Sequence, residues 1–144
     1  MAAAEDSPAD SRPETETTAR RPRAQAQLDF EIDFLGRVLD RDPCYPEALR
    51  VHAMNLAAKG LHRRALALDR RLSRLLPDRP TVWYNLACTY AVLGRPDPAF
   101  DALGHAIALG YRRLRRLCSD PDLRSLRPDP RFARLVREAV RGRC

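Results

Sequence analysis

The stretch WYNLACTYAVLG at residues 83–94 decides the fold, because a weaker copy, LRVHAMNLAAKG, stands 34 residues earlier at 49–60. The same interval of 34 relates five pairs of helix-starting, turn-forming or small residues: Pro43 and Pro77, Pro46 and Pro80, Ala53 and Ala87, Gly60 and Gly94, and Ala65 and Ala99. A fixed register of this kind indicates a repeated two-helix unit that buries its apolar face by stacking on its neighbours. The sequence therefore predicts an all-α solenoid of antiparallel helix pairs.

Proline, glycine and Asp-Pro pairs predict where the helices begin and end. An amphipathic helix is expected from Gln25 to Arg41, followed by helices at 46–60, 61–76 and 80–94. Asp97 and Pro98 suggest the cap and first residue of the next helix, which runs to Gly110. Asp-Pro recurs at 120–121 and 129–130, where it predicts a short turn and a final helix. No strand pattern is found.

The chain divides into a tail and one helical domain. Residues 1–24 contain no Leu, Ile, Val or aromatic residue and show no apolar period, so we expect a disordered N-terminal tail. The domain at 25–142 is expected to hold a half unit (25–45), two repeats (46–79 and 80–113) and a C-terminal cap (114–142). Two full repeats make a short stack, so the leading and closing helices should act as terminal capping helices.

The 83–94 stretch, with Ala99, Leu103 and Ala106, resembles a tetratricopeptide repeat (TPR). Residues 46–79 resemble a divergent copy, in which Leu49, His52, Leu56 and Asp69 stand where the second repeat has Trp83, Leu86, Tyr90 and Leu103. The closing AIALGY at 106–111 and DPDLRSLRPDPRF at 120–132 are similar to the end of many bacterial TPR proteins. The resemblance covers about residues 25–136.

This resemblance implies a protein-binding scaffold that holds a peptide or a partner helix in a concave groove lined by the first helix of each pair. Carried over by position, the groove candidates are Arg50, Met54, Tyr84, Asn85, Cys88 and Val92. Asn85 coincides with an asparagine that contacts peptide backbone in peptide-binding members. The matching residue one repeat earlier is Val51, so the full carboxylate-gripping set is absent. The alternative is that Asn85 only forms hydrogen bonds within the stack.

Charge supports two further interpretations. The net charge is +7, carried by 25 arginines and one lysine. Arginines are dense toward the C-terminus, at positions 112, 113, 115, 116, 124, 127, 131, 134, 137, 141 and 143. They suggest an acidic partner or a nucleic acid, or they are simply solvated, since acids are interspersed. Nucleic-acid binding would require aromatic platforms, and only Tyr111 and Phe132 are nearby. A self-assembly module is a further alternative, because a short stack can leave an apolar end exposed.

Catalytic and cofactor motifs are not found. His52, His62 and His105 lack metal-ligand spacing, and a pairing of His105 with Cys88 would lack an orienting acid. The four cysteines are widely spaced without a C-x-x-C pair, which fits reduced thiols in a cytoplasm. No export leader or membrane-spanning run is recognised. We therefore expect a cytoplasmic, non-enzymatic protein without metal or cofactor, whose oligomeric state is open.

Overall fold

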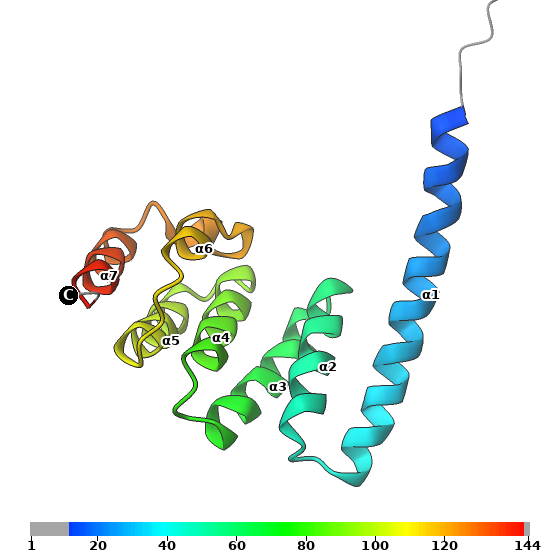
Figure 1. The fold of residues 1–144 in the computed structure, drawn as a ribbon, viewed down its shortest axis with the longest axis horizontal. Coiled ribbons are helices and arrows are strands. Elements are labelled where there is room, and N and C mark those ends of the chain that lie inside the picture. Colours follow the sequence, from blue (N-terminus) through cyan, green and yellow to red (C-terminus); the bar gives the residue numbers. More distant parts are fainter. Residues whose placement is uncertain (1–11, 143–144) are drawn as a thin grey trace, which may run out of the picture.

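The computed structural model describes residues 12–142, and this part of the chain is all helical, without a strand. The helices are α1 (Arg12–Arg41), α2 (Pro46–Ala58), α3 (His62–Leu75), α4 (Pro80–Val92), α5 (Pro96–Ala108), α6 (Leu114–Ser119), the 3-10 helix η1 (Pro121–Leu126) and α7 (Pro130–Arg141). Helices α1 to α5 pack consecutively side by side, whereas η1 packs on α4, and α7 packs on α5 and α6 (Figure 1). The all-α solenoid of helix pairs is confirmed.

The two repeats close their first helix with the same turn. Gly60 and Gly94 have positive φ values of 85° and 71°, a conformation that costs a residue with a Cβ atom energy. The amide after each glycine reaches back to the helix: Leu61 N donates to Leu56 O at 2.8 Å and Arg95 N to Tyr90 O at 3.0 Å. These bonds satisfy carbonyls at the helix end and reverse the chain. The 34-residue spacing of the glycines thus reflects one turn used twice.

Proline occupies the first position of α2, α4, α5, η1 and α7. The prediction for α5 was wrong by two residues, since the helix begins at Pro96, before Asp97 and Pro98. Pro96 is itself well suited to the first position, where a missing N–H costs nothing. Asp97 consequently lies in the first turn, where its negative charge interacts favourably with the positive end of the helix dipole.

The core has two unequal parts. The larger one joins α4 and α5 to the closing segment, with Leu103, Leu117 and Leu123 fully buried. The smaller one joins α1, α2 and α3 through Leu39, Ala48, Leu49 and Leu72. Ala53, Ala65, Ala87 and Ala99 are all buried, as expected of small residues that let paired helices approach closely.

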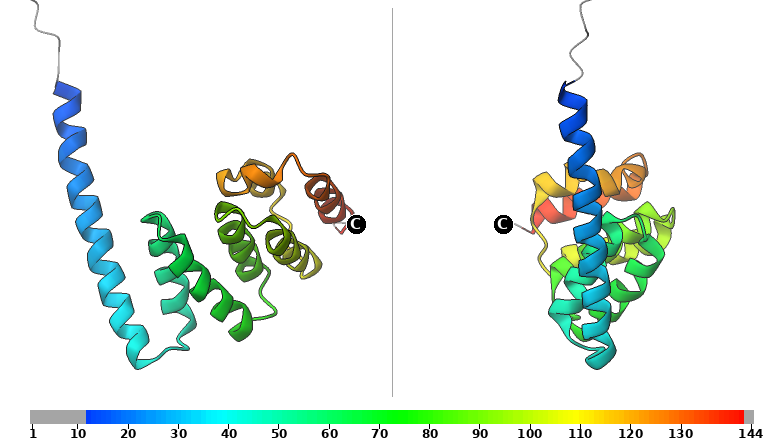
Figure 2. Two further views of the ribbon diagram at one scale, coloured as in Figure 1. Left: turned by 180° about the vertical axis from the view of Figure 1, so that it is seen from behind. Right: turned by 90° about the vertical axis from the view of Figure 1, so that its right-hand side faces the viewer.

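Helix α1 extends well beyond the rest of the stack (Figure 2). Its end at Arg41 agrees with the expected boundary, but its start at Arg12 does not agree with a disordered stretch at 12–24. Residues 1–11 of the expected tail lie outside the described residues. Within residues 12–142, no helix combines the length and apolar character that crossing a bilayer requires.

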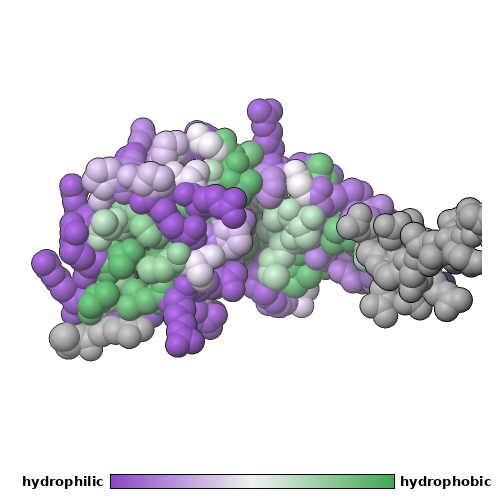
Figure 3. Space-filling view, turned by 90° about the horizontal axis from the view of Figure 1, so that it is seen from above, coloured by the Kyte–Doolittle hydropathy of each residue, from purple (hydrophilic) through white to green (hydrophobic). Residues whose placement is uncertain are grey.

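Large hydrophobic side chains remain at the surface in several places. Phe30 and Phe34 on α1 are 61% and 51% exposed and stack on each other, with ring centroids 6.4 Å apart. Viewed from above, hydrophobic surface is visible at the C-terminal end of the stack and again near its middle (Figure 3). The capping helices therefore cover the two ends only in part.

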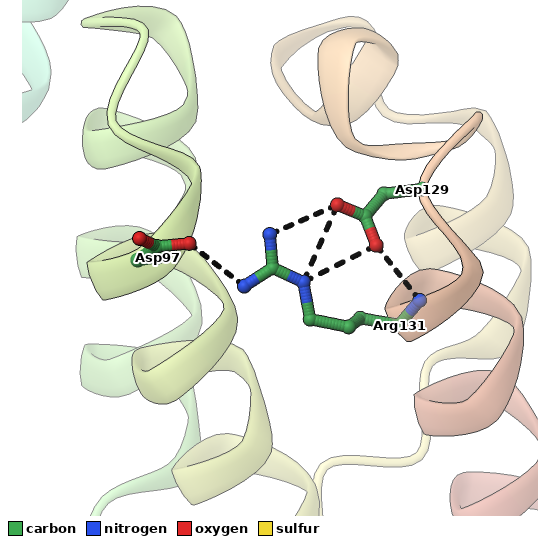
Figure 4. Close-up of polar contacts among 3 residues, drawn as sticks. All are labelled: Asp97, Asp129 and Arg131. Atoms are coloured by element: carbon green, nitrogen blue, oxygen red, sulfur yellow. Dashed lines mark hydrogen bonds and ion pairs between the residues drawn. The ribbon is translucent and has the colours of Figure 1, made fainter.

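Both Asp-Pro pairs begin a helix as predicted. The Asp120 carboxylate accepts a hydrogen bond from the Asp122 amide at 3.0 Å, and Asp129 accepts one from the Arg131 amide at 2.9 Å. The Arg131 guanidinium also donates to Asp129 and, at 2.8 Å, to Asp97 on α5 (Figure 4). This ion-pair bridge attaches α7 to the last repeat.

Candidate protein-binding groove

Four of the six groove candidates are accessible. Arg50 and Met54 lie one turn apart on α2, and Arg50 Nη1 is 3.5 Å from Met54 Sδ. The Arg50 guanidinium is also paired with Glu47, and this hydrogen bond raises the pKa of Arg50. Met54 is 55% exposed and Val92, at the end of α4, is 39% exposed. The first helix of each repeat thus presents an apolar side chain to solvent, Met54 on α2 and Val92 on α4. The Arg50 guanidinium lies beside Met54.

The remaining two candidates, Tyr84 and Cys88, are buried, so they do not line an open groove. Helix η1 packs on α4 and covers them. The Tyr84 hydroxyl donates to Asp120 Oδ2 at 2.7 Å, and its ring stacks on Tyr111 with centroids 4.3 Å apart. Burial raises the pKa of both Tyr84 and Cys88. The closing segment occupies the position that the prediction gave to a partner.

Asn85 lies on α4, directly after Tyr84, and is half-buried. Its backbone carbonyl accepts a hydrogen bond from the Thr89 hydroxyl at 3.1 Å. Its side-chain amide forms no hydrogen bond within residues 12–142, which does not agree with the alternative that it serves the stack. An unpaired amide offers both a donor and an acceptor to an extended peptide.

A buried polar pair between α3 and α4 was not recognised as such in the sequence. Asp69, which replaces the apolar residue of the second repeat, is buried, and its Oδ2 is 2.6 Å from the Thr89 hydroxyl. Burial raises the pKa of Asp69 to about 6, partly offset by the hydrogen bond from Thr89. The available signal was a polar residue in an apolar register position. Asp69 forms a hydrogen bond between the two repeats, whereas in the sequence it indicated only that the first repeat had diverged from the second.

The fold also brings together potential metal ligands that are far apart in sequence. Donor atoms of Cys88, Asp120 and Asp122 lie within 4.8 Å of one another. A thiol with two carboxylates is a donor set that zinc accepts. The Asp120 oxygens, however, already accept hydrogen bonds from Tyr84 and the Asp122 amide, and Oδ2 lies 3.6 Å from the Arg116 guanidinium. Helix capping and ion pairing therefore account for this cluster.

The histidine and cysteine that were considered as a catalytic pair take part in different contacts. The His105 ring stacks on Trp83, with centroids 4.4 Å apart, whereas the Cys88 thiol contacts Asp120 at 3.8 Å. The two aromatic residues near the C-terminal arginines, Tyr111 and Phe132, are both buried. They cannot serve as stacking platforms for nucleic-acid bases in this arrangement.

Comparison with known proteins gives limited similarity. No protein-family model matches the chain. A segment of 74 residues is 34% identical to a chloroplastic protein of Arabidopsis thaliana, and the match covers 47% of this chain. The chain spans about a fifth of the length of that relative, since the match covers 22% of it.

Proposed function

We propose that this protein is a TPR-like adaptor that binds a peptide or partner helix on the face formed by α2 and α4, without chemistry of its own. The contact residues in this proposal are Arg50, Met54, Asn85 and Val92. A cytoplasmic location belongs to the same proposal and rests on the free thiols of Cys44, Cys88 and Cys118.

The observation that carries the proposal is on α4, where the exposed Val92 lies seven residues, or about two turns, after Asn85, whose side-chain amide forms no hydrogen bond within residues 12–142. Met54 and Val92 are large hydrophobic residues that water contacts, and burying such surface drives association. Asn85 can hydrogen-bond to a peptide backbone, which fixes the orientation of the ligand. Because η1 covers Tyr84 and Cys88, the surface for a partner is short and suits a few residues of peptide or two turns of helix.

The test first identifies partners by affinity purification and mass spectrometry from the source cell, then measures binding of a purified partner by calorimetry. The double variant Met54→Glu/Val92→Glu should lose affinity by at least about tenfold, because it places two charges in a desolvated contact. The matched control is Leu109→Glu/Val140→Glu, which changes two other exposed apolar residues by the same charge. Asn85→Ala should weaken binding by about three- to tenfold through a lost hydrogen bond. Equal losses in both double variants, or none in either, would refute the proposed groove.

A further inference from the structure

Helix α3 has an exposed surface that is almost purely basic. It contains five arginines in 14 residues, and its one acid, Asp69, is buried against Thr89. Arg63, Arg70 and Arg74 are separated by seven and four residues, which places them within about 40° of one another around the helix. All three are exposed, on the side opposite to the buried Ala65 and Leu72. We call these three residues the α3 ridge. Seen from behind, α3 runs across the front of α2 (Figure 2, left).

The guanidinium groups of the ridge form no ion pair and no hydrogen bond in the part of the chain that the structure describes. Several C-terminal arginines differ in this respect. Arg112 donates to backbone carbonyls, Arg116 pairs with Asp120, Arg127 donates to the Asp120 carbonyl, and Arg131 pairs with Asp97 and Asp129. The unbalanced basic surface therefore includes a helix that the sequence did not single out. Like charges three to four residues apart destabilise a helix, so an anionic partner would relieve this repulsion.

We propose that the α3 ridge is a docking surface for an acidic helix of a partner protein, with Glu or Asp at positions i, i+7 and i+11. Along the helix axis, the ridge arginines are separated by about 10.5 and about 6 Å, at 1.5 Å per residue. A helix laid parallel to α3 presents carboxylates at the same intervals, in the same order, when its acids follow the same spacing. The ridge lies on the second helix of its repeat, whereas the proposed groove residues lie on α2 and α4. The proposal therefore extends beyond the groove and gives the adaptor a second contact surface.

The chemistry of α3 favours a protein over the other polyanions. The helix contains no Phe, Tyr or Trp on which bases could stack, and its one imidazole, His62, is half-buried at the first position, off the face of the ridge. The residue between the arginines on the same face is Ala67, which is exposed but too small to anchor the helix in a bilayer. Guanidinium groups, by contrast, form bidentate bonds with carboxylates.

The probe is a labelled 18-residue Ala- and Gln-rich helical peptide with Glu at positions 4, 11 and 15, titrated with the full chain by fluorescence anisotropy. Two comparison peptides carry Gln at these positions, or the same three Glu residues distributed around the helix. The variant Arg63→Gln/Arg70→Gln/Arg74→Gln removes the ridge. Its matched control, Arg134→Gln/Arg137→Gln/Arg141→Gln, removes three exposed arginines from one face of α7. Thermal unfolding checks that both variants remain folded.

We expect the ridge variant to bind the probe about tenfold more weakly than the unchanged chain, as three exposed ion pairs would give. The α7 control should bind within about twofold of the unchanged chain, and both comparison peptides should bind more weakly. Equal losses in the two triple variants would overturn the proposal in favour of net charge. Tighter, ridge-dependent binding of a single-stranded oligonucleotide or of phosphatidylserine vesicles would also overturn it. The Met54→Glu/Val92→Glu variant should retain probe binding, which separates a failure of the groove from a failure of the ridge.

Discussion

Asp69 places a carboxylate in the interface between α3 and α4, and we predict that Asp69→Asn stabilises the protein at neutral pH. Burial raises the pKa of Asp69 from 3.8 to about 6. Between these pH values the folded state holds a proton that the unfolded chain has released. Stability therefore falls as pH rises through this window and levels off above it. The pKa difference of about 2 corresponds to about 3 kcal/mol at 1.36 kcal/mol per pKa unit.

The neutral side chain also fits the hydrogen bonds better. The Thr89 hydroxyl lies 2.6 Å from Asp69 and 3.1 Å from the Asn85 carbonyl, and it has one proton to donate. When Asp69 is protonated it can donate to Thr89, while Thr89 donates to Asn85, so every group is satisfied. Asparagine can make the same donation at any pH.

The assay is urea unfolding of both proteins at intervals from pH 4 to pH 8. Asp69→Asn should match the unchanged chain near pH 4 and exceed it by up to about 3 kcal/mol above pH 6.5. The control Asp101→Asn makes the same substitution on the exposed face of α5 and should not reproduce the gain in stability that Asp69→Asn shows above pH 6.5. A stability difference for Asp69→Asn that does not change between pH 4 and pH 8 would refute the reasoning.

Three other substitutions test individual contacts. Tyr84→Phe removes the donor to the buried Asp120 and should lower the free energy of unfolding by about 1–3 kcal/mol in urea titrations. The control Tyr90→Phe should have little effect, because the Tyr90 hydroxyl makes no hydrogen bond within residues 12–142. Trp83→Ala should lower the free energy of unfolding by less than the about 3–5 kcal/mol of a fully buried indole, because Trp83 is half-buried. Trp83→Phe keeps an aromatic ring on His105 but loses the hydrogen bond to Pro77 O, so it should recover part of this loss in the same titration. Arg131→Met should speed amide exchange in α7 relative to α4 at low salt, and this effect should shrink at high salt. Unchanged exchange would show that the ion pairs of Arg131 with Asp97 and Asp129 do not hold α7 in place.

The repeat architecture could be predicted from sequence because its determinants are local. Gly60 and Gly94 set the turns, and proline marks most helix starts, so each boundary follows from the residues beside it. The start of α1 could not be predicted in this way. Its first turns lack an apolar stripe and contain Pro13 and Pro22, so neither periodicity nor helix propensity indicates a helix there.

The site was predicted less well because it depends on contacts between distant segments. Tyr84 and Cys88 occupy first-helix positions that would be open if the repeat stood alone. Asp120, 36 residues after Tyr84, brings η1 over them, and no local pattern announces that contact. Asp69 was similarly interpreted as divergence, since its partner Thr89 belongs to the other repeat.

Because the core is divided unequally, the two ends of the stack should differ in their stability against local unfolding. In a stacked array each unit is stabilised by its nearest neighbours, so the units with two well-packed neighbours open last. Helix α4 is held by α3, α5 and η1, whereas α1 rests on one side only and exposes Phe30 and Phe34 on the other. Opening should begin at α1 and progress toward α4. A partner bound at the α1 end would then slow unfolding. In the C-terminal half, the packing of η1 on α4 already provides this stabilisation.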